Sequence, residues 1–286
     1  MSIITKLYKN GHLKLTDTFA TETHYECIMG SVAYHVSTDT SDMDVHAVTT
    51  PPLEYVFPHT AGFIPGFGLP PPKFDNFQQH NILAYDKNYD VVIYSIIKFF
   101  QLAAENNPNV LDMLWVPDNC ILSIDGIGQY IRKNRKHFLH RGAYHKFRGY
   151  SYAQFKKLTD SPRAELVEKH GYDTKHAYHI IRLAYQCQQV LEEGDMDITR
   201  NSEMLKSIRR GEWTLERIKE RFDAKEKELD ALYVNSKLQY APDWKFLAEM
   251  LMTCLEMKYG SISALHNQTD TMVLQKLEAI RKIVNS

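Results

Sequence analysis

The chain has 286 residues, enough for one large domain or two small ones. Hydrophobic residues make up 44% of it and the formal charge is −1, which predicts a packed core and argues against a uniformly basic surface. The four cysteines form no C-x-x-C pair, which argues against a zinc ribbon and favours reduced thiols. The N-terminus lacks the apolar core of a signal peptide, and no run of about 18 apolar residues could span a membrane. We therefore expect a protein of the cytoplasm.

Three short strands are predicted in the N-terminal part of the chain. Residues 24–29 indicate one strand, residues 43–49 alternate as a second would, and residues 90–94 indicate a third. Because residues 58–77 hold five prolines and three glycines, they cannot form a regular element. A loop of that length acts either as a lid or as an insertion folded onto the surface.

Helical patterns dominate the rest of the chain. Ser95 can cap a helix after the third strand, and Asn107-Pro108 can open another. Beyond residue 120 the pattern is almost wholly helical, with helices expected near residues 174–193, 213–232, 243–258 and 270–284. The sequence therefore predicts an α+β fold, with an N-terminal α/β domain over residues 1–120 and a helical domain over residues 121–286.

Three aspartates form the candidate catalytic centre. Alternation along the strand at 43–49 places Asp42 and Asp44 on one face, about 6–7 Å apart along the backbone. Carboxylates held that close repel each other unless a cation lies between them, and Mg²⁺ prefers such oxygen ligands together with substrate phosphates. Asp90, at the start of the next strand, is our choice for the third carboxylate, as metal ligand and as general base. Asp86 is the reserve candidate.

A Gly-Ser pair precedes these aspartates. Gly30 lets the backbone approach a phosphate closely, and Ser31 adds a hydroxyl and free N–H groups that can bind it. An isolated Asp-x-Asp pair is more often a calcium site, a turn or ordinary solvated charge. The order of the pieces is more specific: a strand, Gly-Ser, a short connector, a strand with Asp-x-Asp, and then a strand with a third aspartate.

This order resembles the nucleotidyltransferase signature of the DNA polymerase β superfamily. Within that superfamily, the stretch DVVIYSIIKFFQLAAENNPNVLDMLW is similar to the RNA-ligase-associated polymerase (RlaP-type) family. The stretches GYDTKHAYHIIRLAYQCQQVLEEG and MLKSIRRGEW are similar to the C-terminal half of the same family. In broken blocks the likeness covers roughly residues 25–215.

The resemblance implies a polymerase-β-like nucleotidyltransferase domain with a small mixed sheet. It also implies ATP or another nucleoside triphosphate as donor, Mg²⁺ (or Mn²⁺) as cofactor, and a link to RNA end repair. The site residues that it carries over are Gly30, Ser31, Asp42, Asp44 and Asp90.

The chain departs from the family pattern at two positions. The family commonly has an arginine after Gly-Ser and a glycine after Ala-Tyr, where this chain has Val32 and His35. The missing arginine removes a potential phosphate contact. Because His is among the residue types enriched at positive φ, His35 can adopt that conformation at modest cost.

Residues 126–159 contain no Asp or Glu but nine lysines and arginines, three histidines and interleaved aromatic residues. A positive surface with stacking side chains suits a triphosphate or a single-stranded nucleic acid. We therefore assign RNA binding to Arg141, Lys146, Arg148 and Tyr150. The alternative is a solvated face whose charges are balanced by acidic partners elsewhere in the fold.

The helix expected at 174–193 has a polar stripe. At ~100° per residue, Lys175, His179 and Arg182 fall within one narrow sector. If this stripe faces the N-terminal domain, it can bind the triphosphate of the nucleotide across the cleft between the domains. The alternative is an ordinary solvated face. His176 points with the apolar side and is expected to be structural.

The sequence thus predicts a metal-dependent nucleotidyltransferase that moves a nucleoside monophosphate from a triphosphate to a hydroxyl group and releases pyrophosphate. The basic aromatic segment makes an RNA 3′ end, and tRNA in particular, the expected acceptor. Two alternatives stay open: nucleotidylation of a protein or small molecule, and a non-catalytic nucleotide- or RNA-binding regulatory protein. The presence of all three candidate carboxylates argues against the second.

Overall fold

The computed structural model describes residues 2–38, 41–262, 277, 280 and 281. Its sheet has the strand order β3-β4-β2-β1-β5. The strands are β1 (Thr23–Ile28), β2 (Met43–Thr49), β3 (Asn76–Ala84), β4 (Lys87–Ser95) and β5 (Ile121–Ile124). The chain passes from β2 to the edge strand β3 and returns as β4, which lies between them, so that β4 runs parallel to β2. The pairs β3–β4, β2–β1 and β1–β5 are antiparallel. The sheet is therefore mixed, as the sequence predicts.

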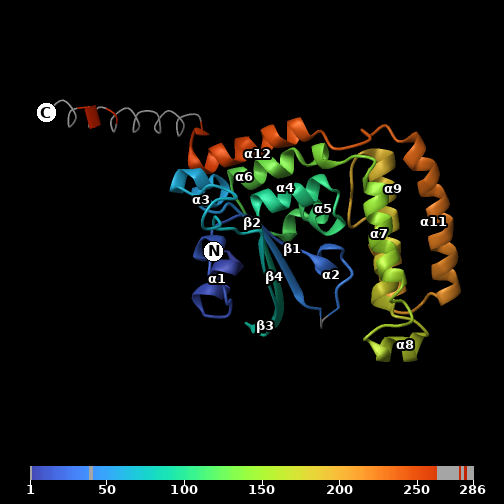
Figure 1. Ribbon diagram of the computed structural model, residues 1–286. Coiled ribbons are helices and arrows are strands. Elements are labelled where there is room, and N and C mark those ends of the chain that lie inside the picture. The colour runs from blue at the N-terminus through green and yellow to red at the C-terminus, as the bar shows by residue number, and fades with distance from the viewer. Residues whose placement is uncertain (1, 39–40, 263–276, 278–279, 282–286) are drawn as a thin grey trace.

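The helices form two groups (Figure 1). Helices α4, α5, α6 and α12 lie together over one face of the sheet, and α7, α9 and α11 stand side by side next to it. The helices are α1 (Ile3–Lys9), α2 (Gly30–Ala33), α3 (Leu53–Val56), α4 (Ile96–Ala104), α5 (Pro108–Trp115), α6 (Gly126–Lys133), α7 (Ala143–Phe155), α8 (Ala164–His170), α9 (Thr174–Glu193), α10 (Ser202–Arg209), α11 (Leu215–Asn235) and α12 (Trp244–Tyr259).

The two faces of the sheet pack into two hydrophobic cores. On β4, Val92 and Tyr94 belong to the larger core, whereas Val91 and Ile93 belong to the smaller one with Ile4 of α1. Successive residues of a strand point to opposite faces, so a strand buried on both sides is a continuous apolar run. The larger core extends from β1 to α12 without interruption and so joins the sheet to the helices.

The strand at 43–49 and the helix at 174–193 are confirmed with the predicted bounds. Ser95 caps α4 and Asn107 caps α5 through their side chains, as predicted. Strand β5 lies just past residue 120, where the sequence predicts helices almost alone. It was not predicted, because four alternating residues are too short a signal. The sheet thus continues beyond the expected domain boundary, and the division into two domains stays a prediction. The helix expected near 270–284 lies outside the described residues apart from three positions.

The segment expected to be irregular at 58–77 has no strand or α-helix as far as residue 75, but its last two residues belong to β3, which begins at Asn76. It holds a 3₁₀ turn at Pro58–Ala61 and a bridge between Ile64 and Phe67. The four cysteines of the chain are free and buried. No helix within the described ranges is both long and apolar enough to cross a membrane.

Candidate active site

The register of the sheet brings two of the predicted catalytic aspartates side by side. Asp44 on β2 is the direct partner of Asp90 on the parallel strand β4. Side chains opposite each other on neighbouring strands share one face, and the strands lie about 4.8 Å apart. Asp42 lies two residues before Asp44, and its Oδ1 accepts a hydrogen bond from Asn88 Nδ2 (2.9 Å).

The three aspartates line one pocket of about 170 Å³, which we call the carboxylate pocket. Its walls come from β1–α2, β2, β4, α9 and α10. It is lined by Gly30, Ser31, Ser41, Asp42, Asp44, Asp90, Lys175, Tyr178, His179 and Arg209. The structure therefore brings together all but one of the residues that the sequence assigns to catalysis and triphosphate binding.

Gly30 lies so close to Asp44 that a side chain does not fit. A Cβ atom on Gly30 would lie 1.7 Å from Asp44 Oδ2, and the φ of Gly30 is +63°, which favours glycine. The N–H of the preceding Met29 donates to the Asp44 carbonyl (2.8 Å). Ser31 follows and is largely buried. His35, just beyond α2, has a left-handed conformation with a φ of 56°.

A bulge in the edge strand β3 holds the carboxylate of Asp90. The β3–β4 register shifts between Gln79 and Ile82, and Asn81 adopts a positive φ of 55° there. The Asn81 N–H donates to Asp90 Oδ1 (2.8 Å), and His80 Nδ1 lies 3.1 Å from Asp90 Oδ2. Bulges often re-aim side chains next to active sites. Sequence reasoning missed both residues because it did not predict β3.

Negative charge is concentrated in the carboxylate pocket. Burial, together with the carboxylates of Asp90 and Asp42, raises the pKa of Asp44 to about 6, although Lys175 and His80 oppose the shift. Such shifts are typical of functional sites. Within the described part of the chain, no three His, Cys, Asp or Glu side chains converge closely enough to hold a metal ion as they stand. The pocket thus offers carboxylates in register rather than a closed set of ligands.

Helix α9 supplies another wall through Lys175 and His179. Asp173 caps α9 by accepting hydrogen bonds from the N–H groups of Lys175 (2.8 Å) and His176 (3.0 Å). It also pairs with Arg163, whose Nε lies 2.8 Å from its Oδ2. Burial, and then the neighbouring cationic side chains, lower the pKa of His179 well below its usual value, so its ring is neutral.

Arg182, which the sequence assigns to the triphosphate, lies elsewhere. Its guanidinium is buried and donates to Asp112, which also accepts hydrogen bonds from Tyr34 Oη (2.6 Å) and Gln186 Nε2 (3.0 Å). It shares the stripe with Lys175, but it lies about 10 Å farther along the helix axis. A helical stripe gives the direction of a side chain but not which turn of the helix faces the pocket.

Arg209, at the end of α10, lines the carboxylate pocket, and the sequence did not predict it. Its Nη1 donates to the Val36 carbonyl (2.6 Å), and its Nη2 lies 3.4 Å from Ser41 Oγ. The block MLKSIRRGEW contains Arg209, and its pair of arginines is the signal that could have identified it.

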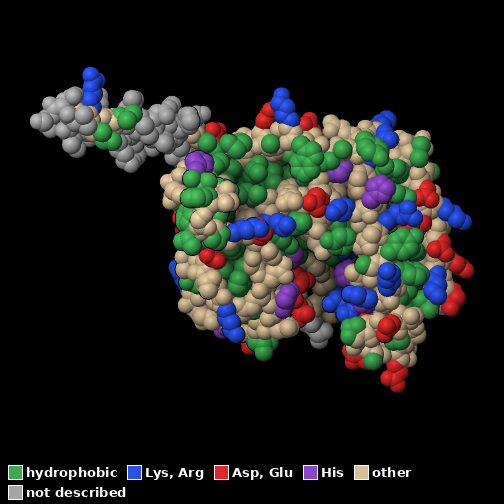
Figure 2. All heavy atoms as spheres, viewed as in Figure 1, with side chains coloured by type: hydrophobic (Ala, Val, Ile, Leu, Met, Phe, Trp, Pro, Cys, Tyr) green, Lys and Arg blue, Asp and Glu red, His purple; other side chains and the backbone are tan. Residues whose placement is uncertain are grey.

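A larger cavity of about 680 Å³ shares Asp42, Lys175 and Arg209 with the carboxylate pocket. We call it the basic cavity, because its lining also includes Arg163, Lys206 and Arg210. Figure 2 shows a hollow between the part that carries the sheet and the neighbouring helices, with acidic and histidine side chains on one rim and basic ones on the other. The aspartates therefore open toward a cationic surface.

The four residues assigned to RNA binding have partners within the fold. Arg141 donates to the carbonyls of residues 234, 236 and 238, which follow or end α11. Lys146 pairs with Glu105 of α4 (3.0 Å), and Arg148 pairs with Glu226 of α11 (2.6 Å). The hydroxyl of Tyr150 accepts a hydrogen bond from Asn107 (2.8 Å). The acids missing from 126–159 thus come from distant parts of the chain, as in the alternative of a face balanced elsewhere in the fold. These contacts hold α7 in place, and RNA binding by the four residues stays a prediction.

The structure also gives the positions of the reserve carboxylate and of the segment at 58–77. Asp86, the reserve carboxylate, lies in the exposed turn between β3 and β4 with a φ of 57°, and it does not line the carboxylate pocket. No residue of the 58–77 segment lines that pocket either. The segment therefore fits the surface insertion better than the lid.

Comparison with known proteins gives one strong match. The model of the RNA repair pathway DNA polymerase beta family (RlaP) matches residues 12–251. No protein with a curated description matches the chain. The solved structure of a nucleotidyltransferase-like protein from Exiguobacterium sibiricum 255-15 is similar at a TM-score of 0.30 and 11% identity, over 82% of this chain and 75% of that one, and so weak a likeness carries no argument. The family match covers most of the sequence, and the chain belongs to the RNA repair pathway DNA polymerase beta family.

Proposed function

We propose that this chain transfers a nucleoside monophosphate from a nucleoside triphosphate, expected to be ATP, to the 3′ hydroxyl of an RNA, expected to be tRNA. Pyrophosphate is the second product. Membership of the family indicates a polymerase-β-like nucleotidyltransferase that acts in RNA repair. The observation that carries the proposal is the pair Asp44 and Asp90, in register on parallel strands, with Gly30 packed against Asp44.

Mg²⁺, or Mn²⁺, is the proposed cofactor. Asp44 and Asp90 present oxygen ligands from adjacent strands, and Asp42 lines the same pocket. Burial, and then the neighbouring carboxylates, raise the pKa of Asp44, and a group of carboxylates in one pocket suits a divalent cation. When bound, the metal would neutralise phosphate charge and polarise the phosphorus under attack. These three aspartates would hold it once their side chains turn toward one another, because no three such side chains among the described residues converge closely enough as they stand.

The boundary between the carboxylate pocket and the basic cavity suits a triphosphate. Lys175 and Arg209 line both spaces, so cationic groups are available on each side of the boundary. Gly30 and Ser31 can bind phosphate oxygens from the side of the sheet. The neutral ring of His179 can donate or accept a hydrogen bond there without adding charge.

Asp90 is the proposed general base. The oxygen of the acceptor hydroxyl bonds to the α-phosphorus while the bond from that phosphorus to the β-phosphate oxygen breaks, and pyrophosphate leaves with that oxygen. The hydroxyl proton passes to a carboxylate oxygen of Asp90. The Asn81 N–H and His80 orient this carboxylate. Lys175 and Arg209 stabilise the charge that develops on the leaving pyrophosphate.

The test is transfer of label from α-labelled triphosphates. Wild-type protein, Asp44→Asn and the double variant Asp42→Ala/Asp44→Ala are each incubated with Mg²⁺, one of the four ribonucleoside triphosphates, and total tRNA. Asp86→Asn is the matched control, because it makes the same chemical change outside the pocket. We expect label in the RNA with wild type and control, and a loss of about a thousandfold or more in the two pocket variants.

Other outcomes separate the alternatives. Label in the protein itself, again only with an intact pocket, would replace the RNA acceptor by a protein hydroxyl. Transfer that persists in Asp44→Asn would contradict the assignment of the carboxylates. Absence of both transfer and triphosphate binding in wild type would favour the non-catalytic regulatory protein.

A further inference from the structure

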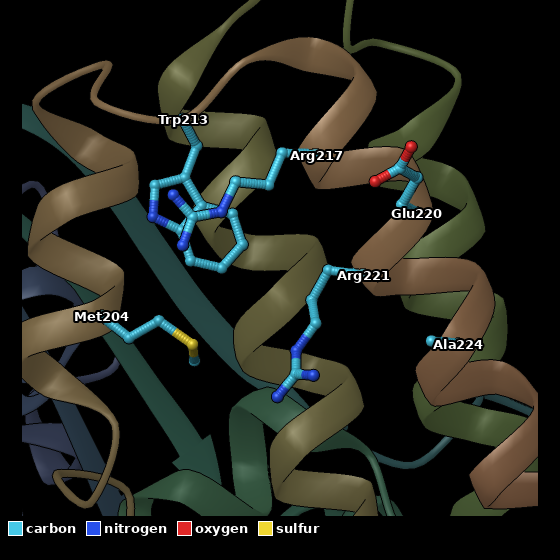
Figure 3. Close-up of a pocket in the computed structure, with 6 residues that line it drawn as sticks. All are labelled: Met204, Trp213, Arg217, Glu220, Arg221 and Ala224. Atoms are coloured by element: carbon cyan, nitrogen blue, oxygen red, sulfur yellow. The ribbon is translucent and has the colours of Figure 1, made fainter.

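A second pocket lies between α10 and α11 (Figure 3). It has a volume of about 490 Å³ and is lined by Met204, Trp213, Arg217, Glu220, Arg221 and Ala224. We call it the arginine pocket. It shares no lining residue with the carboxylate pocket or the basic cavity, so triphosphate binding does not account for it.

Arg217 is held against the ring of Trp213. Its guanidinium carbon lies 3.9 Å from the ring centroid, and the two groups stack in Figure 3. Trp213 is itself anchored, since its Nε1 donates to Ser207 Oγ (2.9 Å) and its carbonyl accepts from Tyr172 Oη (2.6 Å). A guanidinium on an anchored ring keeps its free face and N–H groups available for a ligand.

Arg221 enters the same pocket from the next turn of α11. Its guanidinium carbon lies 5.2 Å from the ring centroid of Tyr185, and it donates a hydrogen bond to the Tyr185 hydroxyl. None of the salt bridges within α10 and α11, as far as the structure describes them, includes Arg217 or Arg221. Unlike Lys146 and Arg148 of α7, these two arginines are in contact with aromatic rings and have no carboxylate partner among the ion pairs of the described residues.

Helix α10 separates the arginine pocket from the basic cavity. Lys206 and Arg209 line the basic cavity, while Met204 of the same helix lines the arginine pocket. Different residues of α10 therefore line the two spaces, and a single strand that passes around this helix would contact both.

We propose that the arginine pocket binds the phosphodiester backbone of the RNA acceptor, upstream of the 3′ end that enters the carboxylate pocket. This inference rests on the proposed function, because it requires an RNA acceptor. The planar guanidinium of arginine matches two oxygens of one phosphate, and the face that is not covered by an aromatic ring can also stack on an unpaired base. Arg217 and Arg221, one turn apart on α11, suit successive phosphates of a single strand.

Glu220 adds a hydrogen-bond acceptor beside the two cations. An ionised carboxylate can only accept, and the ribose 2′-hydroxyl is a donor that DNA lacks. Cations alone would attract any polyanion. The pocket is therefore expected to favour RNA over DNA of the same sequence.

The experiment measures binding of a short fluorescent single-stranded RNA of mixed sequence, without triphosphate so that no transfer occurs. Arg217→Gln/Arg221→Gln is compared with wild type and with Lys219→Gln/Lys227→Gln, which removes the same charge from exposed positions of α11 outside the pocket. We expect the pocket variant to raise the Kd about tenfold or more. Its slope of log affinity against log salt should fall by about 1.4, because each single-strand phosphate contact contributes about 0.7. The control should change little.

Each other result overturns the inference. Equal weakening by both double variants would indicate general attraction to α11. Unchanged RNA affinity together with intact label transfer would exclude the arginine pocket and leave the proposed function standing. Absence of RNA binding in wild type would overturn both. Because Arg217 packs on Trp213, the unfolding midpoint is checked, and Arg221→Gln alone, at an exposed position, carries the test if the double variant does not fold.

The preference for RNA has its own variant. Glu220→Gln keeps the size of the side chain but weakens it as an acceptor, so the ratio of RNA to DNA affinity should fall by about threefold or more. Equal affinity of the wild type for RNA and DNA would remove Glu220 from the proposal.

Discussion

Two strongly charged regions of this chain differ in how their charges are paired in the folded structure. Arg141, just before α7, and Lys146 and Arg148, within it, are bound by carbonyls and carboxylates. These partners come from the residue that ends α4 and from α11 or the residues after it. In the carboxylate pocket, Asp44 and Asp90 lie in register with like charge, and burial together with this repulsion raises the pKa of Asp44 to about 6. In sequence, both regions are dense in charge of one sign. The two regions differ in which charged partners the tertiary structure places beside them.

The difference has an energetic meaning. A paired cation contributes to holding its helix in place, whereas a buried carboxylate beside like charges opposes folding. A fold keeps such unbalanced charge where it is used for something other than stability. The carboxylate pocket should therefore be the region where removing charge abolishes activity without harming the fold, and the α7 contacts should behave in the opposite way.

Among the variants that keep all three aspartates, the largest effect on transfer is expected from Gly30→Ala. An added Cβ would lie 1.7 Å from Asp44 Oδ2, so the carboxylate must move away from its position opposite Asp90. We expect label transfer to fall by about a hundredfold to a thousandfold. Gly11→Ala is the control, because Gly11 also has a positive φ, of 75°, but nothing lies within 4 Å of its added Cβ. If both variants lose activity equally, backbone strain and not the contact with Asp44 explains the loss.

The comparison can be repeated within helix α9. Arg182→Met leaves Asp112 buried without its cation, and we expect the free energy of unfolding to fall by about 3–5 kcal/mol. Lys175→Met, at an exposed position of the same helix, should change it by less than about 0.5 kcal/mol while weakening ATP binding. Urea denaturation and ATP titration measure the two effects. Equal loss of stability in both variants would contradict the separate roles of the two cations.

Local pattern was enough to predict the sheet side of the site. Gly30, Asp42 and Asp44 lie within one short stretch, and the start of the next buried strand identified Asp90. The remaining contributors depend on contacts that no local pattern contains. Arg209 reaches Val36 across a separation of 173 residues.

The errors have the same physical origin. The sequence predicts the direction of Arg182 on its helix, but the carboxylate that neutralises it, Asp112, lies on another helix. The basic segment shows no acids within itself, yet Glu105 and Glu226 supply them in space. The bulge that orients Asp90 was not predicted, because strand β3 itself was missed. Periodicity predicts which face of an element is apolar, but the partner of a charged side chain is a property of the tertiary structure.

Asp44→Asn should make the protein more stable while abolishing transfer. The folded pKa of Asp44, about 6, lies above its ordinary value of 3.8, so ionisation disfavours the folded state. The stability that Asp44 contributes is therefore present at low pH and is lost as the pH rises through about 6. Without metal, the variant should gain about 1–3 kcal/mol over wild type near pH 8 and progressively less toward pH 4. Urea denaturation in EDTA across this range checks it; a gain that does not vary with pH would point to packing instead of charge.

The smallest effect on function is expected from Arg148→Gln. This substitution removes the pair with Glu226 that joins α7 to α11, and the pair is only partly buried, so we expect a loss of about 1–2 kcal/mol in the free energy of unfolding. RNA affinity and its salt dependence should stay within about twofold of wild type, because the guanidinium is already bound inside the fold. The same RNA titration that tests Arg217 and Arg221 measures this. The protein must remain folded in this measurement. A fall in RNA affinity as large as that of the arginine-pocket variant would then show that α7 contacts the RNA, although its cations are paired within the fold.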